Sequence, residues 1–131
     1  MRIGLYSERG RSDVVAARAL VAREGWPATP DGIRAARRAI LALPDDHPAR
    51  PLVWSPDFYS TTGARDLVFH VREHRYTPAR LRAELDALGL ELLGFQHALP
   101  QVAALVEREG WETVENEHPR AFSGMYVLWA R

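Results

Sequence analysis

Short apolar runs near both ends of the chain, and one in its second half, predict three β-strands. Residues 2–6 and 125–129 are the terminal runs, and residues 90–95 directly follow a glycine. Between these runs, apolar side chains recur at intervals of three and four residues, which is typical of helices that bury one face. This mixture of periodicities predicts an α/β protein.

The first two predicted helices carry residues that start and stop helices. Ser12 is a capping residue type ahead of a helical pattern that runs to Gly25, and glycine is favoured just past a helix end. Thr29 and Pro30 repeat the start signal for a second helix, which Pro44 ends. The apolar stripe of this second helix consists of Ile33, Ala36, Ile40 and Leu43.

The second half of the chain repeats these signals. Thr77 and Pro78 begin a helix that Gly89 closes, and residues 101–109 and 111–117 predict two short helices separated by a glycine. The apolar stripe of the first of these three helices consists of Leu81, Leu85 and Leu88.

The middle of the chain is less regular. Residues 44–63 include four prolines, so we expect an ordered loop there. Residues 65–75 fit two structures: apolar residues at every second position favour a strand, whereas Leu67, Phe69 and His70 would also fit one face of a short helix. Both structures stay open at this point.

Composition narrows the chemistry. The chain has 131 residues, 47% of them hydrophobic. Its 17 basic residues balance 17 acidic ones, which argues against nucleic acid as a partner. Every basic residue is an arginine and cysteine is absent, which excludes lysine Schiff bases, thiol catalysis and thiolate metal sites within these residues. Because no apolar run approaches the roughly 20 residues that span a bilayer, and no signal peptide is evident, we expect a cytoplasmic protein without membrane contacts.

Four segments together resemble a known family: Ile3–Ser7, Arg65–Thr77, Leu88–Phe95 and Phe122–Trp129. As an ordered set they are similar to the C-terminal half of bacterial class I S-adenosylmethionine-dependent methyltransferases, in particular those attached to tetratricopeptide repeats. The resemblance covers nearly the whole chain, so it implies that residues 1–131 are the C-terminal portion of a methyltransferase domain.

The resemblance implies a specific sheet. Residues 2–6, 125–129 and 90–95 would be strands five, seven and six, in that spatial order, and strand seven would run antiparallel between two parallel neighbours. The expected fold is therefore a three-stranded mixed sheet with flanking helices and a substrate-side insertion at about residues 44–76. The outer edge of residues 2–6 would normally pair with strand four, so we expect that edge to be unpaired.

The resemblance also implies S-adenosylmethionine as the cofactor of the complete enzyme. Its glycine-rich turn and ribose-binding acid have no counterpart here, and Gly4 and Gly10 lack the spacing of a nucleotide-binding turn. We therefore expect that this chain alone neither binds the cofactor nor is active. A fragment, the product of a truncated gene and a naturally short paralogue would all fit this sequence. The expected partner is the missing N-terminal methyltransferase half or a tetratricopeptide-repeat region.

Four residues are candidate substrate contacts. Tyr6 and Ser7 lie at the C-terminal end of a predicted parallel strand, at the edge where open α/β sheets bind ligands; the simpler alternative is that they form a turn. Tyr59 and Arg65 lie in or beside the insertion, where this superfamily usually builds substrate specificity. The sequence leaves the methyl acceptor open.

Three further residues are candidate catalytic groups, because methyl transfer sometimes requires a general base. Asp66, His70 and His74 have suitable side chains in the same region. The alternative is structural, with Arg65 and Asp66 paired on the surface and His70 packed beside Phe69.

Two other functions are weighed against the methyltransferase. A non-catalytic module would pair its exposed strand edge with another chain, as a homodimer for example. A zinc hydrolase is suggested by His70-Val71-Arg72-Glu73-His74, which matches an inverted zinc-protease motif. That motif needs a firm helix and a third ligand, and neither is evident.

Overall fold

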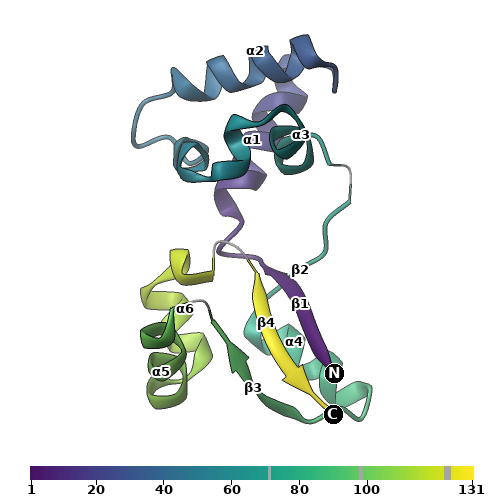
Figure 1. The fold of residues 1–131 in the computed structure, drawn as a ribbon, viewed down its shortest axis with the longest axis vertical. Helices are drawn as coiled ribbons and strands as arrows, with labels where there is room; N and C mark the ends of the chain where they lie inside the picture. Colours follow the sequence, from purple (N-terminus) through teal and green to yellow (C-terminus); the bar gives the residue numbers. More distant parts are fainter. Residues whose placement is uncertain (71, 98, 123–124) are drawn as a thin grey trace. The chain divides into compact units, whose positions relative to one another are not determined.

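The computed structural model describes residues 1–70, 72–97, 99–122 and 125–131 (Figure 1). Val71 of the histidine motif and Ser123–Gly124 of the family resemblance lie outside the described residues. The chain forms two compact units. One, the sheet unit, consists of Met1–Arg11 and His74–Arg131, and the other, the helical unit, of Ser12–Glu73. The helical unit thus begins well before the predicted insertion at about residues 44–76.

The sheet unit contains a mixed sheet of four strands in the order β2-β1-β4-β3, in which β4 runs antiparallel to both neighbours and β2 runs parallel to β1 (Figure 1). The predicted α/β class and the predicted order of the three longer strands are confirmed. The predicted number of strands is wrong, because a two-residue strand joins the sheet. The strands are β1 (Arg2–Ser7), β2 (Arg75–Tyr76), β3 (Leu92–Gln96) and β4 (Tyr126–Ala130).

The outer edge of β1 is paired only at its end. Tyr6 and Ser7 pair with β2, so the prediction of a wholly unpaired edge is wrong there. Met1 and Ala130 exchange backbone hydrogen bonds, so the antiparallel alternation turns the N–H and C=O groups of Arg2 and Gly4 outward. Among the described residues no strand pairs with Arg2 or Gly4 on that side.

Three helices pack with the sheet around one apolar core. They are α4 (Pro78–Ala87), α5 (Pro100–Glu109) and α6 (Trp111–Glu117). Thr77 caps α4 as predicted, but Leu88 is 72% exposed beyond the helix end and does not belong to its apolar stripe. A short 3-10 helix, η3 (Pro119–Phe122), follows α6. The buried core residues are Leu81, Leu85, Val106, Trp111, Val114, Phe122, Tyr126, Leu128 and Ala130.

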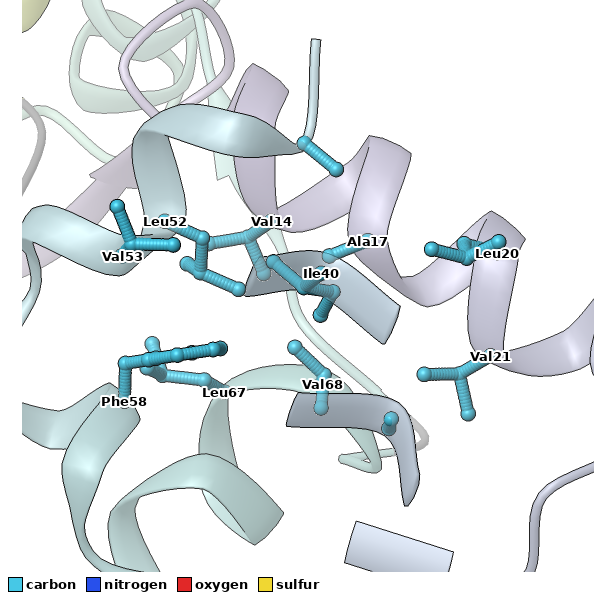
Figure 2. Close-up of a cluster of buried hydrophobic side chains, with 12 residues drawn as sticks. Val14, Ala17, Leu20, Val21, Ile40, Leu52, Val53, Phe58, Leu67 and Val68 are labelled. Carbon is cyan, nitrogen blue, oxygen red and sulfur yellow. The ribbon is translucent and has the colours of Figure 1, made fainter. Parts of the chain in front are cut away.

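The helical unit has its own core, into which the labelled apolar side chains of Figure 2 converge. Both predicted helices are present, and Thr29 caps the second with its side chain. The expected loop at residues 44–63 contains two 3-10 helices, whose Leu52 and Phe58 fill the centre of the core. The elements are α1 (Ser12–Glu24), α2 (Pro30–Leu41), η1 (Arg50–Trp54), η2 (Pro56–Tyr59) and α3 (Thr61–Val68).

The open segment at residues 65–75 begins as a helix. Ser60 caps α3 by accepting a hydrogen bond from the Gly63 amide at 2.9 Å, and Leu67 and Val68 enter the core on its buried face. The helix ends at Val68, and no helix or strand follows before β2 among the described residues. Among all the described residues, every helix is too short or too polar to cross a bilayer.

Candidate functional site

The C-terminal end of α3 borders an open surface hollow of about 530 Å³, which we call the α3 hollow. Arg65 and Asp66 lie on the helix, Phe69 is its C-cap residue, and His70 follows directly. The structure thus groups three predicted site residues, Arg65, Asp66 and His70. The lining is completed by Phe69 and Arg72.

The charged groups of the hollow are exposed and lack ion-pair partners among the described residues. Arg65 and Asp66 do not form the surface pair that the structural alternative predicted, and Arg72 has no acidic partner. His70 is exposed rather than packed in the core. Three charged side chains and an imidazole therefore face solvent around one concave surface.

The neighbouring acid, Glu73, has a different role. Its side chain is 4% exposed, and its Oε2 accepts a hydrogen bond from Arg18 Nη2 of α1 at 3.0 Å. Arg18 also donates from Nε to the carbonyl oxygen of Leu67 at 2.8 Å, near the end of α3. This buried ion pair ties the chain beyond α3 to α1 and directs the Glu73 carboxylate away from solvent.

The predicted site residues Tyr59 and His74 do not line the hollow. Tyr59 is 57% exposed, and its ring meets Phe58 edge to face. His74 is exposed and begins the sheet unit, whereas His70 belongs to the helical unit. Because α3 ends at Val68, the two histidines lack the helix that the zinc motif requires, and the described residues contain no group of three potential metal ligands.

A second polar cluster lies inside the sheet unit, and we call it the Glu115 cluster. The hydroxyl of Ser7 donates to Glu115 Oε1 at 2.5 Å, and the hydroxyl of Tyr126 donates to the same oxygen. The Gly10 amide donates to Ser7 Oγ at 2.7 Å. All three side chains are buried, with Glu115 only 1% exposed, so the cluster is part of the core.

The Glu115 cluster joins several strand ends at the edge where β1 finishes. Ser7 ends β1, Tyr126 begins the antiparallel β4, and the Tyr76 carbonyl at the end of β2 accepts a 2.9 Å hydrogen bond from the Glu8 amide. Burial raises the pKa of the Tyr126 hydroxyl, and its hydrogen bond to Glu115 raises that pKa further, so Tyr126 stays a donor. The cluster therefore holds this edge of the sheet together.

The cluster changes the interpretation of two predicted substrate contacts. Ser7 is completely buried and its hydroxyl is already hydrogen bonded, so it serves the fold rather than a ligand. Tyr6 is half-buried, and the Arg11 guanidinium carbon lies 4.4 Å from its ring centroid. Neither side chain lies in the α3 hollow.

Sequence reasoning missed Glu115 because the other two acids of α6, Glu112 and Glu117, are exposed. The available signal was spacing, since Trp111, Val114 and Glu115 stand at positions i, i+3 and i+4, and all three are buried. From the sequence, Phe69 is expected only to pack beside His70, and Arg72 is part of the histidine motif only.

The residues after β1 do not fit S-adenosylmethionine. A nucleotide-binding turn presents free backbone amides, but the amide of Gly10, the glycine in this turn, is already bonded to Ser7 Oγ. Arg11, at the end of the turn, is itself 7% exposed and stacks on Tyr6. We therefore assign no step to the cofactor on these residues.

Comparison of the sequence with protein-family models found no match, and no curated protein matches it either. The evidence on function is therefore the fold, the α3 hollow, the Glu115 cluster and the sequence resemblance.

Proposed function

We propose that this chain is the C-terminal part of a class I S-adenosylmethionine-dependent methyltransferase and supplies its substrate-side residues. The observation that carries the proposal is the sheet, in which the last strand, β4, inserts antiparallel between β1 and β3. In the proposed assignment β1, β4 and β3 are strands five, seven and six of that family.

The outer edge of β1 supports the same assignment. Arg2 and Gly4 turn their backbone hydrogen-bonding groups outward, where strand four of the family would pair with β1. The cofactor would be held by a polypeptide segment that contains the glycine-rich turn. This chain would contribute the α3 hollow, where Asp66 or His70 is suited to accept a proton from the methyl acceptor.

Calorimetric titration tests the assignment. The chain alone should not bind S-adenosylmethionine or S-adenosylhomocysteine, and micromolar binding would overturn the mapping of its strands. A polypeptide containing strands one to four of a methyltransferase of this type should associate with the chain and bind the cofactor in the mixture.

Arg2→Pro and Arg2→Ala together test whether the two polypeptides of that mixture associate through the outer edge of β1. Arg2→Pro removes an outward N–H while keeping the hydrogen bonds to β4, and Arg2→Ala removes the same side chain but keeps the N–H. Association that is lost in Arg2→Pro and kept in Arg2→Ala supports edge pairing. Equal association of both variants contradicts it.

The same edge favours one alternative, a non-catalytic module that pairs with a second copy of itself. Sedimentation of the chain alone separates the two functions. A stable dimer that Arg2→Pro converts to a monomer, together with no association with the methyltransferase segment, would favour the module. A monomer would exclude self-pairing at this edge.

A further inference from the structure

The α3 hollow combines positive charge with an apolar wall. The lining contains two guanidinium groups, Arg65 and Arg72, and one carboxylate, Asp66, so it carries a net positive charge even with His70 neutral. Phe69 is half-buried and adds an aromatic surface to the same wall.

Two backbone carbonyl groups at the end of α3 are hydrogen bonded without the side chains of Arg65 or Arg72. The Arg65 carbonyl accepts from the Phe69 amide at 2.9 Å, and the Leu67 carbonyl accepts from Arg18. The arginine side chains are therefore not required to satisfy these carbonyls.

The acid nearest to Arg72 in sequence does not line the hollow. Glu73 directly follows Arg72 and would neutralise it on the surface, but its carboxylate is buried against Arg18. The positive charge of Arg72 is therefore left for another partner. Guanidinium groups bind carboxylates and phosphates in a planar, paired geometry.

We propose that the α3 hollow binds a small molecule that carries a carboxylate or phosphate group next to an apolar or aromatic portion. Arg65 and Arg72 bind the anionic oxygens, and Phe69 contacts the apolar portion. If the proposed methyltransferase function holds, on which this part rests, that molecule is the methyl acceptor. Asp66 and His70 then lie beside its anionic end.

An NMR titration of the whole chain with benzoate tests the site without any cofactor. Benzoate carries one carboxylate on an aromatic ring, and phenyl phosphate carries a phosphate on the same ring, so their relative affinity distinguishes the two anions. Benzylammonium and benzyl alcohol are the cationic and neutral controls. We expect saturable shifts of the amide signals of residues 65–70 with the anions only, at millimolar affinity, as befits an exposed site.

Four substitutions complete the experiment. Arg65→Gln and Arg72→Gln should each weaken binding about threefold, and Asp66→Asn should strengthen it by about as much, since exposed charge pairs contribute modestly. Arg38→Gln is the matched control, because Arg38 is also an exposed arginine in the last turn of a helix of this unit and should leave binding unchanged.

Two results would overturn the proposal: equal shifts with benzylammonium, or anion affinity that is the same in Arg65→Gln, Arg72→Gln and Arg38→Gln. Either result leaves the strand assignment standing, because that assignment is tested by calorimetry and edge pairing. Conversely, benzoate binding with a failed edge test would leave an anion site on a protein of another function.

Discussion

Removing a single hydroxyl from the Glu115 cluster should destabilise the sheet unit measurably. Tyr126→Phe keeps the aromatic ring, whose centroid lies 4.6 Å from that of Trp111. It deletes the hydroxyl, which donates to Glu115 and also lies 3.3 Å from the Tyr76 carbonyl oxygen. No arginine pairs with Glu115 among the described residues, so its burial depends on the hydroxyls of Ser7 and Tyr126.

The expected loss in the free energy of unfolding follows from the charge of the acceptor, the Glu115 carboxylate. A hydrogen bond to a charged group contributes about 1.5–3 kcal/mol, so Tyr126→Phe should lower the free energy of unfolding by that amount. In a Glu115→Gln background the acceptor is neutral, and the same substitution should cost only about 0.5–1.5 kcal/mol. The double-mutant cycle should therefore give a coupling of roughly 1 kcal/mol.

Native-state hydrogen exchange at the amides of β1 and β4 is the suitable assay, because the chain forms two compact units and a global transition could mix them. Urea unfolding followed by circular dichroism provides a second measurement of the same difference. A cost below about 0.5 kcal/mol, or equal costs in the two backgrounds, would refute the proposed role of the carboxylate.

Three further predictions concern pH, a helix cap and a close backbone contact. Above pH 10 the free energy of unfolding of the wild type should fall by up to about 1.4 kcal/mol per pH unit more than that of Tyr126→Phe. The reason is that the pKa of Tyr126 is raised in the folded protein, so this side chain ionises near pH 10 only when the chain is unfolded. Parallel curves of unfolding free energy against pH would contradict this. Thr77→Ala should destabilise the sheet unit by about 1 kcal/mol, because it removes the acceptor of the 3.2 Å hydrogen bond from the Arg80 amide. Thr77→Asp keeps an acceptor and should not destabilise it. Equal melting temperatures of the two variants would exclude a capping role. Gly32→Ala would place a Cβ atom 2.0 Å from the Pro27 carbonyl oxygen and should cost about 1–3 kcal/mol, so an unchanged urea midpoint would show that this contact relaxes freely.

The sequence determined the elements whose signals are local. Thr29 and Thr77 cap helices because a threonine hydroxyl reaches an amide three residues ahead, which requires no distant contact. Their closeness in sequence placed Arg65, Asp66 and His70 in one candidate region, but whether they share a surface depended on the helix at residues 65–68, which the sequence left open. The order of the strands was expected only through the family resemblance, because local periodicity carries no information on which strands pair.

Only the tertiary structure decided the features that depend on distant partners. Residues 65–68 became helical, rather than a strand, because Leu67 and Val68 find a core built by α1 and η1. Glu115 is accommodated in the core because Ser7, 108 positions away in sequence, supplies a buried hydrogen-bond donor. The physical reason is that burying a carboxylate is costly unless donors surround it, and those donors are brought together only when the strands pair.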